Sequence, residues 1–471
     1  MRTLILGTAA LMMLSVGVSS AQLDSSQQDC ANTLHKDAMK ISIAQAKQLA
    51  GCVKDAQKGT ITDLAACLAA APNDLVTKAL GISTADSGKF CGSTPATFGI
   101  APAFEITTNE AAVIHTRGLI TDLLGASPTV PGDKAGNACQ SMAVKKAQGF
   151  AKSYAKAAAK CVRDQLKTGA TGGSALSPCL APDLAKYVSV LATAVAKSCE
   201  GANTTVALPG VCSGLSGSAL ANCVTYRATC RTCRMLATDG GLDTDCDLID
   251  DGQANASCSF PVSISGEAFK FNGAQEFVPD AYIWVLEHPE MNLVTGADGH
   301  FEFSGLEEGS EVTLVLEHPD YHPIQTGTIH LGATGAQRVT FQAVPWDVYN
   351  ALASVLALVP DELNKCQMVT TVTCVGKSMY DEGAHGEVAA TVDLTPALPA
   401  ENGPIYFNSS VIPQTNLTKT SDDGGVLYVQ VPPGEYVWTA HKGSAIFTRV
   451  KMKCRVGLLV DASPPWGLQK H

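Results

Sequence analysis

The chain has 471 residues, of which 33 are Lys or Arg and 44 are Asp or Glu, so its net charge is −11. This acidic balance argues against non-specific nucleic-acid binding, which depends on clustered cations. Aromatic residues make up only 6% of the chain, so a broad aromatic binding platform is not expected either. The length allows two to four domains.

The first residues have the pattern of a secretory signal peptide. Arg2 supplies a positive charge, Leu4–Val18 is an uncharged apolar run, and the small residues Ser19–Ala21 precede a cleavage position. We therefore predict a signal peptide at residues 1–21. The alternative is a membrane anchor, but the run is shorter than the roughly 20 residues that span a bilayer. No later run is judged long and apolar enough to span a bilayer, so we expect no membrane span and a secreted or periplasmic protein.

Seventeen Cys residues in an exported chain indicate disulfide bonds. Eight of them form two sets that repeat at offsets of 109, 109, 112 and 108 residues. The first set is Cys30, Cys52, Cys67 and Cys91, and the second is Cys139, Cys161, Cys179 and Cys199. We predict a duplicated module, with copy 1 at residues 22–125 and copy 2 at residues 126–205.

Each copy is predicted to form an antiparallel helical hairpin. Residues Gln28–Ala56 and Gln140–Leu166 are rich in Ala, Lys, Gln and Leu, which favour helices. Two Cys residues 22 positions apart, as in the first arm of each copy, end about 40° from each other, on one helix face. The simplest pairing is nested, although the spacing leaves other connectivities open. The predicted pairs are Cys52–Cys67 and Cys30–Cys91 in copy 1, and Cys161–Cys179 and Cys139–Cys199 in copy 2.

A third helix is predicted between the copies, at Glu110–Leu124, with Thr107 or Thr108 as its N-cap. It contains His115. We interpret this residue as an ordinary surface or core histidine rather than a functional one.

Residues 206–260 are predicted to be a connector rich in Cys and Asp. Its six Cys residues favour three structural disulfides. Cys230 and Cys233 have the spacing of a redox dithiol or a zinc ribbon. The thioredoxin-like surroundings of the former and the second close Cys pair of the latter are missing.

The alternation of Asp residues in the connector is suited to a hard cation such as calcium. The candidate ligands are Asp243, Asp245, Asp247, Asp250 and Asp251. The alternative is a solvated acidic linker, because the Gly and the terminal Glu of an EF-hand loop are missing.

From residue 261 onward, alternating Val, Ile, Thr, Phe and Tyr with Gly, Pro and Asp turns predict β-sandwiches. We expect a first sandwich at residues 261–345, a helical linker at 346–365 and a second sandwich at 366–471. Asp298-Gly299 is predicted to form a hairpin turn, since Gly accepts a positive φ.

Both predicted sandwiches contain recurring motifs. The first has Gly266, Pro279-Asp-Ala281 and Thr295-Gly-Ala-Asp-Gly-His-Phe-Glu-Phe303. The second has Thr420-Ser-Asp-Asp-Gly-Gly-Val-Leu-Tyr428 followed by Val431-Pro-Pro-Gly-Glu-Tyr436. These segments resemble carboxypeptidase regulatory-like domains. The first copy departs from that pattern at Glu308–Glu311, where the family has Pro-Gly-x-Tyr.

The resemblance implies transthyretin-like sandwiches, and modules of that family are usually non-catalytic and contact carbohydrate or protein. The predicted fold is therefore multidomain α plus β. Duplicated, disulfide-stapled helical hairpins precede two transthyretin-like or immunoglobulin-like β-sandwiches. In the second sandwich, Cys366–Cys454 would join the first and last strands and leave Cys374 as the odd thiol. An alternative pairs Cys366 with Cys374 across a hairpin.

Five His residues occur close together in the first sandwich, and three are candidate ligands for zinc or iron. These are His318, His322 and His330. No serine nucleophile elbow, phosphate loop or His-Glu-x-x-His motif is found.

Three functions remain open from the sequence. We favour an exported, non-catalytic structural or interaction protein of the cell envelope or extracellular space, which would contact protein or carbohydrate. The alternatives are a secreted metal-dependent enzyme that uses the His cluster, and a calcium-dependent adhesion or matrix component.

Overall fold

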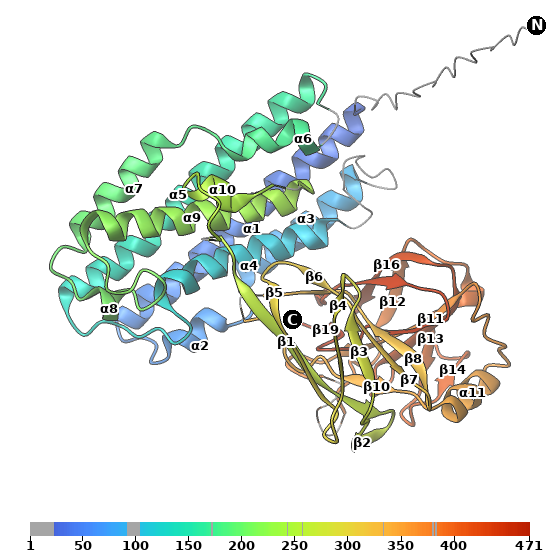
Figure 1. Ribbon diagram of the computed structural model, residues 1–471. Helices are drawn as coiled ribbons and strands as arrows, with labels where there is room; N and C mark the ends of the chain where they lie inside the picture. Colours follow the sequence, from blue (N-terminus) through green and yellow to red (C-terminus); the bar gives the residue numbers. More distant parts are fainter. Residues whose placement is uncertain are drawn as a thin grey trace, which may run out of the picture.

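The computed structural model describes residues 23–91, 104–170, 173–242, 244–256, 258–332, 334–378, 381 and 384–471. A helical half comes first along the chain and a β half follows it (Figure 1). This division agrees with the predicted order of stapled helices and then β-sheets. The predicted signal peptide at residues 1–21 lies outside the described residues.

Two long helices, α1 (Ser25–Gln57) and α5 (Lys134–Lys167), occupy the predicted first arms of the two copies. The Asp133 side chain accepts a hydrogen bond from the N–H of Gly136, so α5 starts six residues before the predicted Gln140. The other helices of this half are short or intermediate in length. They are α2 (Leu64–Ala69), α3 (Asp74–Phe90), α4 (Glu105–Leu124), α6 (Gly173–Leu176), the 3₁₀ helix η1 (Ser177–Leu180), α7 (Ala185–Ser198), α8 (Thr204–Ala207), α9 (Gly217–Gly240) and α10 (Cys246–Asp250).

The predicted third helix, α4, begins at Glu105, so the predicted start at Glu110 was wrong. Thr107 and Thr108 lie inside the helix rather than at its N-cap. The Thr108 hydroxyl donates a hydrogen bond to the carbonyl of Glu105, a partner within the first helical turn. The helix is mostly buried, and His115 on it is only 3% exposed.

Eight disulfide bonds join sixteen of the seventeen Cys residues, with Cα–Cα distances of 4.4–5.8 Å. The pairs in the helical copies are Cys30–Cys91, Cys52–Cys67, Cys139–Cys199 and Cys161–Cys179, the nested pattern expected from the spacing. The other four are Cys212–Cys223, Cys230–Cys258, Cys233–Cys246 and Cys366–Cys454. Each bond is expected to stabilise the fold by roughly 2–4 kcal/mol, mainly by constraining the unfolded chain.

Cys230 and Cys233 have different partners and are fully buried. They therefore do not form a dithiol pair, and the redox interpretation of this motif has no support in the geometry.

Cys374 is the one free thiol, and it is partly buried. Burial raises its pKa, and the nearby Glu387 carboxylate raises it further. We expect one alkyl group per chain after prolonged treatment of the native protein with iodoacetamide at pH 8, read by intact mass. Labelling should be slower than for free cysteine because less thiolate is present. Two or more labels, or none after unfolding, would contradict the disulfide map.

Contrary to the expectation that no later run is long and apolar enough, one stretch of the described residues, 177–198, could cross a membrane by length and composition, and 22% of that window is buried. Its helix is interrupted between η1 and α7, where Pro182 lies. Disulfides at Cys179 and Cys199 tie both ends to α5. We interpret this stretch as the return arm of the second copy.

The β half contains nineteen strands and two hydrophobic clusters among the described residues. The strands before the linker are β1 (Pro261–Lys270), β2 (Gly273–Phe277), β3 (Tyr282–Val285), β4 (His288–Val294), β5 (His300–Glu307), β6 (Glu311–Val312), β7 (Leu314–His318), β8 (Tyr321–Thr326), β9 (Ile329–His330) and β10 (Phe341–Ala343). The linker forms helix α11 (Trp346–Val355). The strands after it are β11 (Cys366–Thr373), β12 (Thr391–Thr395), β13 (Ile405–Phe407), β14 (Pro413–Gln414), β15 (Gly425–Val431), β16 (Gly434–His441), β17 (Val450–Cys454), β18 (Leu459–Asp461) and β19 (Leu468–Gln469), with a 3₁₀ turn η2 (Ala400–Asn402) between β12 and β13.

A single ten-stranded sheet runs through both predicted sandwiches, in the order β14-β13-β15-β11-β18-β8-β7-β3-β4, with β19 paired to β11. Strand β18, near the end of the chain, lies between β11 and β8 and is parallel to both. The sequence analysis treated the two sandwiches as separate units. The shared sheet joins them, because backbone hydrogen bonds continue from one to the other.

The Asp298-Gly299 turn does not close a hairpin, contrary to the prediction. It connects β4, which pairs with β3, to β5, which pairs with β1 in another sheet. The turn does require its glycine, since Gly299 has a φ of +63°. It therefore carries the chain from one sheet to the other.

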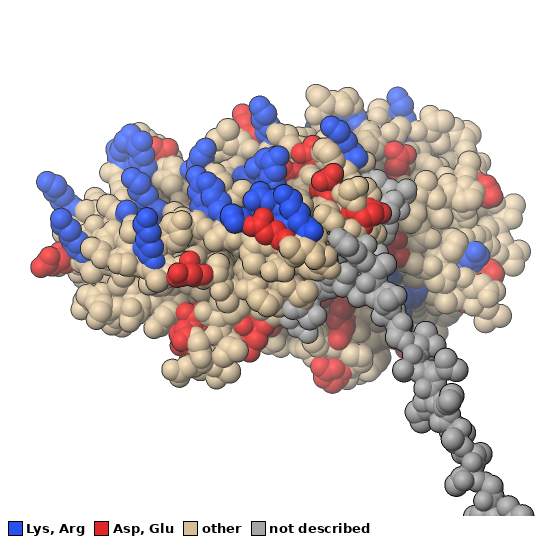
Figure 2. All heavy atoms as spheres, turned by 90° about the horizontal axis from the view of Figure 1, so that it is seen from above, with Lys and Arg blue, Asp and Glu red and all other residues tan. Residues whose placement is uncertain are grey.

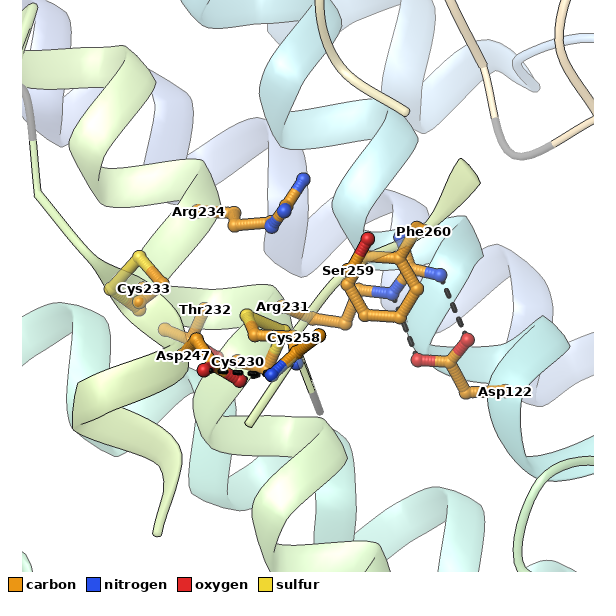
Figure 3. The surroundings of a disulfide bond; sticks show 12 residues. Asp122, Cys230, Arg231, Thr232, Cys233, Arg234, Asp247, Cys258, Ser259 and Phe260 are labelled. Carbon is orange, nitrogen blue, oxygen red and sulfur yellow. Dashed lines mark hydrogen bonds and ion pairs between the residues drawn. A yellow bond between two sulfur atoms is a disulfide. The ribbon is translucent and has the colours of Figure 1, made fainter. Parts of the chain in front are cut away.

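A buried charge cluster joins the two halves, and Figure 3 shows its Arg231, Asp122 and Phe260 side chains beside the Cys230–Cys258 disulfide. Arg231 of α9 donates to both carboxylate oxygens of Asp122 of α4, at 2.8 Å each. Its remaining nitrogen lies 2.5 Å from Glu308 of the β half. The Phe260 ring, where the chain enters β1, packs 3.5 Å from the guanidinium. Arg231 is 3% exposed, so this one cation neutralises carboxylates from both halves.

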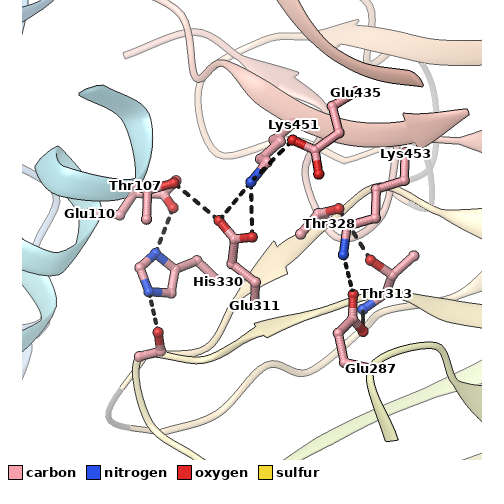
Figure 4. Close-up of polar contacts among 11 residues, drawn as sticks. Thr107, Glu110, Glu287, Glu311, Thr313, Thr328, His330, Glu435, Lys451 and Lys453 are labelled. Carbon is pink, nitrogen blue, oxygen red and sulfur yellow. Dashed lines mark hydrogen bonds and ion pairs between the residues drawn. The ribbon is translucent and has the colours of Figure 1, made fainter. Parts of the chain in front are cut away.

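A second set of contacts lies at the start of α4 (Figure 4). His330 of β9 contacts Glu110 at 2.9 Å through Nδ1 and the Gly309 carbonyl at 2.6 Å through Nε2. Lys451 of β17 donates to Glu311, which also accepts from the Thr107 hydroxyl at 3.0 Å. These contacts hold α4 against the β half.

The His330 contact predicts a pH-dependent stability. Burial lowers the pKa of His330, but the Glu110 carboxylate, the Gly309 carbonyl and the Glu311 carboxylate together outweigh burial and leave the pKa raised. The contribution of this pair should be complete below the unfolded pKa of about 6.5 and should disappear as pH rises through the folded pKa. We expect His330→Gln to lower the urea midpoint more at pH 5.5 than at pH 8.5. The exposed His288→Gln is the control, and an equal loss for His330→Gln at both pH values would contradict this assignment.

Candidate functional site

The three predicted metal-binding histidines lie in separate surroundings. His318 Nδ1 accepts from the Asp320 N–H, and His322 stacks on Tyr349 at 3.9 Å and contacts Glu362 at 3.2 Å. His330 lies at the junction with α4. Among the described residues, no group of three or more His, Cys, Asp or Glu side chains is arranged to hold a metal ion. The structure therefore does not assemble the predicted zinc or iron site.

The acidic connector is organised by backbone hydrogen bonds. Asp245 caps α10 by accepting from the N–H groups of the next turn, and Asp247 accepts from the N–H of Ala256 and Cys258. Asp251 accepts from the Gln253 N–H. Asp250, at the end of α10, is 7% exposed. Asp243 lies outside the described residues. Asp245, Asp247 and Asp251 thus stabilise turns, and the described acidic residues form no group of three or more arranged to hold a metal ion.

A different surface feature is prominent on the two long helices. Exposed Lys and Arg residues repeat at the same offset of 109 as the Cys residues. The equivalent pairs are Lys36 and Lys145, Lys47 and Lys156, Lys54 and Arg163, and Lys58 and Lys167. Copy 2 adds Lys152 and Lys160. At about 100° per residue, each set falls within roughly 80° of arc and extends over roughly 33 Å of helix. We call these ten residues the cationic face.

The repeat places the two stripes on the same side of the α1 and α5 pair. The side chain of Gln57, at the end of α1, bonds to residues near the start of α5, so the helices are antiparallel. Ser42 and Ala151, which are equivalent positions, line one hollow between the helices. A half-turn about an axis perpendicular to both helices therefore exchanges them. Such a rotation keeps the equivalent faces of α1 and α5 on the same side of the helix pair. The two rows of cations therefore lie side by side on that side.

The charge of the molecule is strongly divided between its halves. Residues 1–242 hold 22 Lys and Arg against 15 Asp and Glu, whereas residues 243–471 hold 11 against 29. The net charges are therefore +7 and −18. Figure 2 shows the Lys and Arg side chains gathered over the helical half. The overall charge of −11 had concealed this division.

The cationic face is solvated and nearly free of opposing charge. The exposed acidic residues of α1 and α5 are Asp29, Asp55 and Asp164, and Asp164 pairs with Lys160 at 2.8 Å. Both helices are described throughout, and neither exposes a large apolar side chain. A surface of this kind can neutralise a row of anionic groups and release their counterions. It has no apolar residues that would insert into a lipid layer.

Sequence reasoning missed this surface, although the signal was present. The offset that revealed the Cys duplication also relates the cations, and their 11-, 7- and 4-residue spacings keep them on one helical face.

Comparisons with known proteins give no family. No protein-family model matches the chain, and no curated protein matches it. Among solved structures, the TIE protein of Bacillus anthracis is 11% identical over 43% of this chain, with a TM-score of 0.16, and the chain spans only a third of it. The minor pilin GBS52 of Streptococcus agalactiae is 8% identical, covering 44% of this chain and 95% of its own, with a TM-score of 0.15. A putative carbohydrate-binding protein from Bacteroides uniformis is 10% identical, covering 41% and 97%, also with a TM-score of 0.15. Similarities at this level do not define a function.

Proposed function

We propose that this chain is an exported, non-catalytic interaction protein whose cationic face binds an anionic polysaccharide at the cell surface or in the extracellular medium. The observation that carries the proposal is the repetition of the exposed cations in both copies of the helical module. The two copies present them on one side of the molecule, so a linear polyanion can contact many of them at once.

The setting favours a polysaccharide over the other polyanions. Eight disulfides fit an oxidising compartment, where nucleic acid is not the usual polymer. A lipid surface is disfavoured because α1 and α5 expose no large apolar side chain. The acidic β half would repel the same polymer, and so direct it to the helical half.

Retention on immobilised polysaccharides tests the proposal. We expect the mature protein to bind dextran sulfate and polygalacturonate, to elute with added NaCl, and to pass through unmodified dextran. Equal retention on unmodified dextran, or no retention on either anionic polymer, would refute the proposal. Tighter binding to vesicles of anionic phospholipid than to dextran sulfate would also refute it in favour of a membrane surface.

A further inference from the structure

A groove of about 190 Å³ lies in the β half, away from the cationic face. Its floor is the shared sheet, with Val369 of β11 and Leu427 of β15, and its roof includes Leu352 and Ala353 of α11. The lining crosses the five neighbouring strands β13, β15, β11, β18 and β8, a width of roughly 19 Å. The groove exists because β18 joins the two sandwiches into one surface under α11. Its volume is enough for roughly ten non-hydrogen atoms.

One end of the groove is polar. Asp461 of β18 is 4% exposed and accepts from the Ser463 N–H at 2.9 Å. The Ser463 hydroxyl lies 3.2 Å from that of Thr371. Asp423 lines the groove beyond Thr371 and accepts from the Gly425 N–H at 3.0 Å. Two carboxyl groups and two hydroxyls therefore border the same end.

Neither carboxyl forms a salt bridge within the described part of the chain, and no Lys or Arg lines the groove. Burial raises the pKa of Asp461 to about 6 and also raises that of Asp423.

A second unsatisfied group faces the same space. Gln367 of β11 is 4% exposed and lines the groove. Its Oε1 accepts from the Gln430 N–H at 2.9 Å, whereas its Nε2 is buried without a hydrogen-bond partner. A buried donor without a partner is costly, and an acceptor on the apolar part of a ligand would remove that cost, since an ammonium head can only donate.

We propose that this groove binds an elongated, mainly apolar molecule that ends in an ammonium group, with the ammonium against Asp461 and the apolar part between the sheet and α11. An ammonium supplies the cation that the two carboxyls lack and donates to the hydroxyl oxygens. An anionic head would face Asp461 and Asp423 in a groove whose lining holds His385 but no Lys or Arg. This site is independent of polyanion binding, which needs no residue of the β half.

Calorimetry of the mature protein at pH 7.5 with octylammonium, 1-octanol and octanoate tests the proposal. We expect saturable binding of octylammonium at least 10-fold tighter than that of 1-octanol, and no binding of octanoate. Methylammonium controls for attraction to the acidic β half and should not bind measurably. Equal affinity for octylammonium and 1-octanol, or tighter octanoate binding, would overturn the proposal.

Two variants locate the binding. Asp461→Asn should weaken octylammonium at least 10-fold and leave 1-octanol within about 2-fold, whereas the exposed Asp320→Asn should change neither. Should Asp461→Asn prove unstable, Ala353→Trp fills the groove from α11 and should abolish binding of both. Octylammonium binding that survives Ala353→Trp would place the ligand elsewhere and overturn the assignment.

Discussion

Arg231→Met is expected to destabilise the protein by about 3–5 kcal/mol, because it leaves Asp122 and Glu308 buried without their cation. Burial lowers the pKa of Arg231, yet the two carboxylates outweigh burial and raise it, so the side chain stays charged in the fold. The loss should appear as a lower urea midpoint with the disulfides intact. The substitution removes the contact between α9 and α4 and the contact between the two halves together, so both halves should unfold at lower denaturant.

Arg227→Met is the matched control for this prediction. Arg227 lies on the same helix, is partly exposed, and approaches only the Phe260 ring, at 5.3 Å. We expect its loss to cost about 0.5 kcal/mol or less, as is usual for a surface substitution. A loss below about 1 kcal/mol for Arg231→Met would show that the buried cluster does not stabilise the junction.

A triple variant of the cationic face, Lys152→Gln, Lys156→Gln and Lys160→Gln, is expected to weaken dextran sulfate binding on the order of 100-fold at 0.1 M NaCl. Each cation that neutralises an anionic group of the polymer steepens the dependence of log K on log[NaCl] by roughly 0.7–0.9. The loss of three such cations should therefore lower the association constant by about two powers of ten at this salt concentration. The three side chains are exposed on α5, and their removal should leave the thermal midpoint nearly unchanged.

The control carries the same three changes on the β half, at Lys270, Lys377 and Lys419. It alters the net charge equally and leaves the cationic face intact. We expect less than about a 3-fold loss of dextran sulfate binding. Equal losses in the two triple variants would mean that net charge, rather than the face, determines binding.

The disulfides of the helical copies were predictable because helix geometry and Cys spacing are local. The 22-residue spacing from Cys30 to Cys52 places both on one side of α1, and the return arm then meets them in nested order. The second copy of the module repeats nearly the same Cys spacing about 109 residues later, and this repetition supports the same pairing. For Cys366 the sequence left two partners open, Cys374 and Cys454, and the structure has Cys366–Cys454.

The shared sheet and the charge cluster were not predictable in the same way. Strand β18 is three residues long, and its parallel neighbours β8 and β11 are distant in the sequence. Nothing local marks it as a central strand. Likewise, Arg231 meets Asp122 across 109 residues and Glu308 across 77, and each is an unremarkable charged residue in the sequence.

The three candidate histidines lie apart in the structure because proximity in sequence does not determine proximity in a sheet. His318 and His322 flank the turn from β7 to β8, and His322 turns toward α11, where it stacks on Tyr349. His330, on β9, faces α4 instead. The strand that carries each side chain decides which surface it reaches.

The salt dependence of dextran sulfate binding tests the proposed function most directly. We predict that the logarithm of the association constant falls linearly with the logarithm of NaCl concentration, with a slope of roughly −4 or steeper, as expected when about six of the ten cations of the face are engaged. A slope shallower than about −1 would mean that at most one or two ion contacts form. In that case the cationic face would not be the binding surface.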